Sequence, residues 1–175
     1  MIINSNNYFD FILNNFKCIA KTIKKTTNEL SPHDFKNVFD SEEAKQARDI
    51  IYIFMAKEKV PRLKGESRIV YIGQTKRSLQ ARHSSTSRKK AESEANKAKY
   101  NHIIKHYQEI TVYYLAHKEY APDLSLVKLE GQFLWWYFQN HLEYPPLNYT
   151  KTKIRTPEYK FLTPQTNKSN QETKQ

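Results

Sequence analysis

The most informative seven residues of the chain are Val70-Tyr71-Ile72-Gly73-Gln74-Thr75-Lys76. β-Branched and aromatic residues favour a strand, and a glycine followed by polar residues is typical of the end of one. A second run of this kind occupies residues 50–56. The polar segment between the two contains Pro61 and Gly65, so the pattern predicts two antiparallel strands joined by a long loop at 57–67.

The rest of the pattern predicts an α+β protein with a small central antiparallel sheet of three strands flanked by helices. The third strand is expected at 110–116, where β-branched and aromatic residues recur. Apolar residues at three- and four-residue steps, caps and proline stops predict the helices. These are expected at 8–30, 42–48, 79–107 and 124–141.

A chain of 175 residues has room for one ordinary domain. We expect an N-terminal helical arm at 1–49 and a central domain at 50–150, which carries a basic helical insert at about 84–107. A basic polar tail, short of apolar residues, follows at 151–175.

Positive charge is concentrated in particular parts of the chain. Lys and Arg number 29 against 18 Asp and Glu, which gives a net charge of +11. Residues 77–106 carry eight bases and two acids, whereas 107–150 carry two bases and five acids. This uneven distribution favours a surface that follows a phosphate backbone over a uniformly solvated basic surface. The candidate contacts to DNA are Arg77, Arg88, Lys89, Lys90 and Lys97.

Several classes of protein are excluded by composition. The three glycines lie far apart, so the glycine-rich turns that bind nucleotide cofactors are absent. Cys18 is the single cysteine, which rules out an internal disulfide and favours a reducing compartment. We find no signal-peptide pattern and no membrane span, and therefore expect a cytoplasmic protein.

Four residues of catalytic type follow one another on the expected elements. Tyr52 and Tyr71 fall on adjacent strands, Arg82 on the next helix and Glu130 on the last helix. Facing side chains on paired strands lie about 5 Å apart, so the two phenols can share one pocket. A phenol is a poor base at its ordinary pKa of about 10 unless a cation lowers that pKa, and Arg82 and Lys76 are the candidates.

This constellation resembles the GIY-YIG nuclease superfamily. Residues 70–76 are similar to the second half of the family motif, and Ile50-Ile51-Tyr52 to the first half, with Ile50 in the place of its glycine. Glu130 would be the family's helical glutamate and Asn148 its late asparagine. Thr86 stands where relatives often carry His or Tyr. The nearby His83 is only a weak substitute for it, because it is rotated by about 100° around the helix from Arg82.

The resemblance implies roles for these residues. Tyr52 would be the general base, Tyr71 would position the phosphate, Arg82 would stabilise its charge, and Glu130 would bind Mg²⁺, for which Mn²⁺ could substitute. Gly73 and Asn148 would be structural. The compact plan resembles the small type II restriction endonucleases of the superfamily, which implies a homodimer that cuts double-stranded DNA.

Other interpretations of the sequence stay open. The chain could be a phage or mobile-element nuclease of looser specificity, a ribonuclease, or a non-catalytic DNA-binding module. His102 and His106 have the spacing of a zinc site without a third ligand, and a solvated helix face is the simpler interpretation. The aromatic run at 135–138 fits packing better than base stacking.

Overall fold

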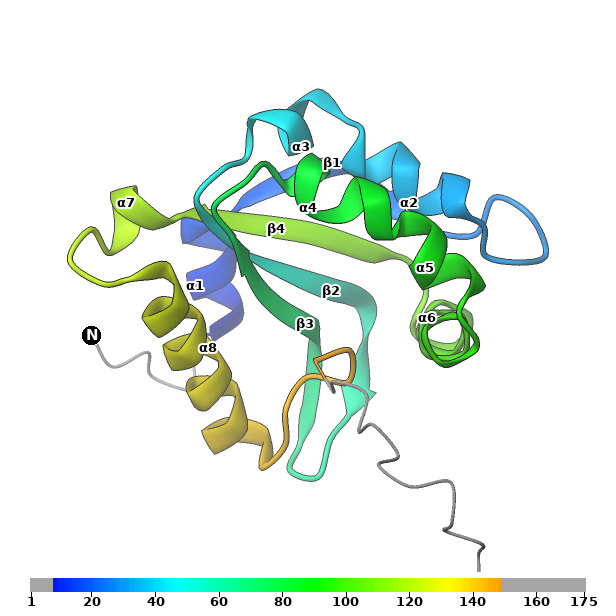
Figure 1. Cartoon of the computed structure of the whole chain (residues 1–175). Helices are drawn as coiled ribbons and strands as arrows, with labels where there is room; N and C mark the ends of the chain where they lie inside the picture. Colours follow the sequence, from blue (N-terminus) through cyan, green and yellow to red (C-terminus); the bar gives the residue numbers. More distant parts are fainter. Residues whose placement is uncertain (1–7, 149–175) are drawn as a thin grey trace, which may run out of the picture.

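The computed structural model describes residues 8–148 and contains one antiparallel sheet with helices on both faces (Figure 1). The strands are β1 (Lys17–Ile23), β2 (Ile50–Pro61), β3 (Glu66–Thr75) and β4 (Ile110–Ala116), in the spatial order β1-β4-β2-β3. The helices are α1 (Tyr8–Asn15), α2 (Pro32–Phe39), α3 (Glu42–Gln46), α4 (Leu79–His83), the 3₁₀ turn η2 (Ser84–Thr86), α5 (Ser87–Glu92), α6 (Glu94–Tyr107), α7 (His117–Tyr120) and α8 (Leu126–His141). The α+β class is therefore confirmed.

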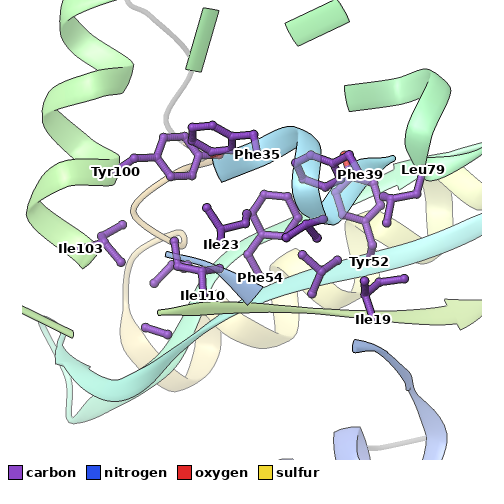
Figure 2. Packing of buried hydrophobic residues seen from close by; sticks show 14 of the residues in the cluster. Ile19, Ile23, Phe35, Phe39, Tyr52, Phe54, Leu79, Tyr100, Ile103 and Ile110 are labelled. Carbon is purple, nitrogen blue, oxygen red and sulfur yellow. The ribbon is translucent and has the colours of Figure 1, made fainter. Parts of the chain in front are cut away.

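The sheet separates two hydrophobic cores. On one face, Tyr52 and Phe54 pack with Phe39 of α2 and with residues of α4 to α6 (Figure 2). On the other face, Ile51 and Ile53 pack against α1 and α8. Because side chains alternate along a strand, β2 supplies both cores, and this explains why its first seven residues are all buried.

The prediction of three strands and of one long helix over 8–30 is wrong, because β1 adds a fourth strand. Ile19 and Ile23 are both buried on the α2 side of the sheet, four residues apart, and that spacing is typical of a helix. The register of β1 against β4 is irregular between Cys18 and Thr22. Because side chains alternate along a strand, residues four positions apart also share one face of a strand, so the spacing of Ile19 and Ile23 fits both structures.

The hairpin of β2 and β3 is longer than expected, and its loop is shorter. Only residues 62–65 lie outside the two strands, where a loop was expected over 57–67. The N–H of Arg62 donates to the carbonyl of Gly65 at 2.9 Å, and Gly65 has a φ of +69°, a value that glycine adopts without strain. Tyr52 pairs with Gly73 and Tyr71 pairs with Phe54, in the part of the hairpin that lies away from this loop.

The helices that cover the Tyr52 face begin at well-formed caps. Ser31 and Asp34 form a capping box at the start of α2, with Pro32 in the first turn. Ser78 accepts from the N–H of Ala81 at the start of α4. This cap sets Arg82 one turn further on. None of the helices within residues 8–148 is long and apolar enough to cross a membrane.

Candidate active site

Two tyrosines stack on the α4 side of the sheet. Tyr52 is paired with Gly73 and Tyr71 with Phe54, so the two phenols are diagonal neighbours on one face. Their ring centroids are 5.8 Å apart, with an angle of 26° between the planes. Tyr52 is fully buried, whereas Tyr71 is partly exposed. The phenol of Tyr52 therefore lies inside the protein, and the phenol of Tyr71 lies at its surface.

Gly73 makes this stacking possible. A Cβ added at Gly73 would lie 2.5 Å from Cε1 of Tyr71 and 2.8 Å from Cζ of Tyr52. Both distances are far inside van der Waals contact, so any side chain would force the rings apart. Sequence reasoning identified Gly73 as structural, and the structure gives the physical reason: the two phenols occupy the volume of its side chain.

Arg82 lies between the phenols and the last helix. Its side chain is exposed on α4. The contact with Tyr52 is the main cause that raises the pKa of Arg82, and Tyr71 raises it further. The charge of the same guanidinium acts to lower the pKa of Glu130. Arg82 therefore connects all three residues electrostatically and stays cationic.

Burial determines the protonation of Tyr52. Loss of solvent raises the pKa of Tyr52 well above its ordinary value, and the neighbouring Tyr71 raises it further, whereas Arg82 lowers it. The first effect is the largest, so Arg82 does not lower the pKa below that of a free phenol. Among residues 8–148 no hydrogen bond of good geometry reaches the buried hydroxyl oxygen of Tyr52, although Arg82 and Tyr71 lie close enough to shift its pKa. Tyr52 is thus a neutral phenol with unused hydrogen-bonding capacity, directed at the tyrosine and arginine beside it.

Glu130 reaches the same place from α8. Burial raises the pKa of its carboxyl group, and the charge of Arg82 and a hydrogen bond from the backbone N–H of Gln74 lower it in part. Gln74 follows Gly73 on β3, so the carboxylate lies at the edge of the strand that carries Tyr71. The fold thus brings together four residues of which the first and the last are 78 positions apart in the sequence: Tyr52, Tyr71, Arg82 and Glu130.

Asn148 fastens the same strand edge. Its side-chain oxygen accepts from the N–H of Ile72 at 2.9 Å, and its amide donates to the carbonyl of Ile72 at 2.6 Å. The N–H of Leu147 donates to the carbonyl of Val70 at 2.9 Å. Together with Glu130 on Gln74, these bonds occupy alternate outward-facing backbone groups of β3, and an edge strand is thereby protected.

The expected basic contacts are spread over different parts of the molecule. Lys76 is exposed and lines a separate cavity of about 500 Å³ beside Asp49 and His117. Arg77 is exposed just after β3, and Lys97 on α6 pairs with Glu29 at 2.9 Å. The backbones of Arg88 and Lys89 belong to α5, but their side chains lie outside the described part of the structure. Lys76 and Lys97, whose surroundings are described, therefore have other neighbours than the four central residues.

Lys90, one of the candidate contacts to DNA, is only partly exposed, and its amino group lies against neighbouring side chains. Its amino group lies 2.9 Å from Nδ1 of His83 and 2.6 Å from Oγ1 of Thr86. It also lies 5.5 Å from the centroid of the Phe39 ring, on which His83 stacks at 4.4 Å. The pKa of Lys90 is lowered to about 7, mainly by burial and secondly by the charge of Arg82.

Sequence reasoning missed this inner group. His83 was considered a weak substitute because it lies about 100° around the helix from Arg82. The structure shows it buried, with its ring 5.1 Å from that of Tyr52 in an edge-to-face contact. Thr86 and Lys90 share an i, i+4 spacing that could have indicated their contact, because such residues lie on one helical face.

A divalent cation would have one carboxylate here. Residues 8–148 contain no group of three or more His, Cys, Asp or Glu side chains placed to hold a metal ion. Mg²⁺ is commonly bound by one or two carboxylates together with water and substrate phosphate. Glu130, partly buried and with limited compensation of its charge, fits such a site once a phosphate is present.

No protein-family model, curated protein or solved structure matches this chain. The resemblance to GIY-YIG nucleases accordingly stays a prediction carried by the residues themselves.

Proposed function

We propose that this protein is an endonuclease that hydrolyses phosphodiester bonds of double-stranded DNA. The observation that carries the proposal is the convergence of Tyr52, Tyr71 and Arg82 with the carboxylate of Glu130 at one end of β3. The net charge of +11 supports a polyanionic substrate.

Hydrolysis adds water across a P–O bond, so the water must lose a proton while the departing oxygen gains one. Tyr71, partly exposed above the buried Tyr52, can donate a hydrogen bond to a phosphate oxygen. The guanidinium of Arg82 offers paired donors to the negative charge that develops on the phosphoryl group. Glu130 would hold Mg²⁺ or Mn²⁺, which when bound neutralises charge on the phosphate.

Tyr52 is the candidate to accept the proton of the attacking water. Its buried hydroxyl has no other partner among the described residues and lies next to the cation of Arg82. The raised pKa of Tyr52 means that only a small fraction is ionised at neutral pH, and this fraction grows with pH. The proposed enzyme should therefore be most active in alkaline solution.

The finer proposal is a type II restriction endonuclease acting as a homodimer, since a two-fold protein presents one site to each strand of a palindrome. Digestion of plasmid DNA in Mg²⁺ or Mn²⁺ tests both levels. Discrete fragments support a restriction enzyme, and a smear or nicked circles support a nuclease of looser specificity. Intact plasmid with salt-sensitive binding would instead identify a DNA-binding module, and parallel digestion of RNA tests a ribonuclease.

A further inference from the structure

A small cavity opens beside the proposed active site. It has a volume of about 270 Å³ and lies between β3, α4, α5 and α6. Its lining includes Tyr71, Arg82, Lys90, Asn96 and Lys99. This volume is below that of pockets that enclose whole small molecules. The cavity is of a size to hold one chemical group of a larger ligand.

The lining is electrostatically one-sided. It contains three cationic side chains, Arg82, Lys90 and Lys99, and no Asp or Glu among the described lining residues. The other titratable groups are Tyr71, Tyr100 and His83, and burial lowers the pKa of that histidine well below its ordinary value, so it is neutral. From α2 the neighbouring group is the Phe39 ring. Lys99 has a further interaction of its own, so the positive charge available to a ligand is that of Arg82 and Lys90, which face the cavity without an acidic residue in its described lining.

The amino group of Lys90 is positioned by the protein and has a donor left over. A protonated amine has three N–H donors, and those of Lys90 are directed by Thr86 and His83. Because a protonated amine cannot accept, Nδ1 of His83 is the acceptor. Two donors are thus committed, and the third is available to the cavity that Lys90 lines.

We propose that this cavity binds a phosphate group of the nucleic-acid strand, with the amino group of Lys90 donating to a phosphate oxygen beside the guanidinium of Arg82. The proposal rests on the nuclease function and adds Lys90 of α5 to the residues that bind the phosphate. One helical turn after Arg82 this chain has Thr86, which carries no charge. Lys90 therefore supplies the second cation near Tyr71. The partly neutral amine of the free protein becomes cationic when the phosphate arrives, since a nearby anion favours the charged form.

The test follows the lysine signals of the full-length chain by NMR, with ¹³C at the lysine ε carbons. Inorganic phosphate is one titrant, and a short DNA duplex in EDTA, which prevents cleavage, is the other. The signal of Lys90 is the one that disappears in Lys90→Met. In the free protein it should titrate near neutral pH, and either titrant should raise the pKa that it reports by about one unit or more. This measurement on the unmodified chain does not depend on whether a variant folds.

Affinity provides the second readout. Lys90→Met should weaken binding of phosphate and duplex by about tenfold, because a charge-assisted hydrogen bond is lost while the aliphatic stem is kept. The matched control is Lys105→Met at an exposed position of α6, which should bind as the unmodified chain does. Wild-type affinity in Lys90→Met, or a Lys90 signal that ignores both titrants, overturns the proposal. A response to phosphate without a response to duplex overturns the assignment to nucleic acid.

The two proposals fail in different ways. A chain that cuts DNA while its Lys90 signal ignores the duplex retains the nuclease function and loses the phosphate ligand. A Lys90 signal that responds in a chain that cuts no nucleic acid retains the phosphate site and rules out the nuclease function.

Discussion

Gly73 faces Tyr52 across the β2–β3 pairing, and the ring of Tyr52 occupies the space of the side chain that Gly73 lacks. The ring of Tyr71 closes the same space from its own strand. A backbone without a Cβ is therefore the condition for two stacked phenols on this face, which links a property of one residue to the geometry of the candidate active site.

Replacing Gly73 by alanine should destabilise the fold by about 1–3 kcal/mol, because a buried methyl group must displace two aromatic rings. Chemical denaturation measures this change, and cleavage should fall with it because the rings move. The control is Gly131→Ala on α8, where an added Cβ meets nothing within 4 Å. That change should stabilise the helix by up to about 1 kcal/mol. Equal stability of both variants would show that the crowding at Gly73 is unimportant.

Tyr52→Phe should separate catalysis from stability. Among residues 8–148 the buried hydroxyl makes no hydrogen bond of good geometry and only approaches Arg82 and Tyr71, so its removal should change the free energy of unfolding by less than about 1 kcal/mol. Cleavage should drop by about 100-fold or more if Tyr52 is the base. Tyr137→Phe is the matched control, because that hydroxyl donates to the carbonyl of Ile69 far along the strand. It should lose some stability and keep its cleavage rate at equal folded concentration.

The rate of cleavage should rise as the pH is raised into the alkaline range. Burial raises the pKa of Tyr52, so below that pKa the ionised fraction increases about tenfold for each pH unit. Single-turnover rates measured with saturating metal should follow this slope from about pH 6 to 9. A rate that is flat over this range would assign the proton transfer to another group.

Glu130→Gln should keep the structure and lose the activity. Glutamine can still accept from the N–H of Gln74, but it has no charge to hold a cation. We expect cleavage to fall about 100-fold or more and its dependence on Mg²⁺ concentration to disappear. If the role of Glu130 is only to cap the edge of β3, this variant will cleave normally.

The same variant gives a stability prediction. Burial raises the pKa of Glu130 above its value in the unfolded chain. The stabilisation from its bound proton is complete below the unfolded pKa of about 4.3 and is lost as the pH rises through the folded value. Glu130→Gln should therefore melt at a higher temperature than the unmodified chain at pH 7, and the difference should vanish below about pH 4. Thermal melts at the two pH values measure it.

Asn148→Ala should loosen the edge of β3. It removes both hydrogen bonds to the backbone of Ile72 and should cost about 1–2 kcal/mol of stability. Hydrogen exchange at the amide of Ile72 should accelerate. Asn140→Ala, which removes one bond to the carbonyl of Trp136 within α8, is the control and should leave that amide unaffected.

The sequence was sufficient where local pattern and final structure agree. The strand at 110–116 and the position of Tyr52 beside Tyr71 on one face follow from β-branched runs whose alternation sets the face of each residue. It was insufficient for β1, since Ile19 and Ile23 have helical spacing and only the pairing with β4 makes that segment a strand. Such tertiary pairing is not encoded in a local window.

The candidate site divides in the same way. Identity and order were enough to select Tyr52, Tyr71, Arg82 and Glu130, whose roles stay predictions. The inward direction of Lys90 was not foreseeable from a run of basic residues, because it depends on α5 packing against α2 and on Thr86 and His83 as partners. The pKa of Tyr52 likewise depends on burial, which no motif specifies.

Single-turnover cleavage of supercoiled plasmid in Mg²⁺, with the unmodified chain and Arg82→Lys side by side, tests the central claim most directly. Arg82 approaches both phenols and Glu130, and lysine keeps its charge but not its paired donors. We predict cleavage by the unmodified chain and a rate about 100-fold or more lower for Arg82→Lys with unchanged circular dichroism. Intact plasmid with the unmodified chain, or equal rates for the two proteins, would contradict the account.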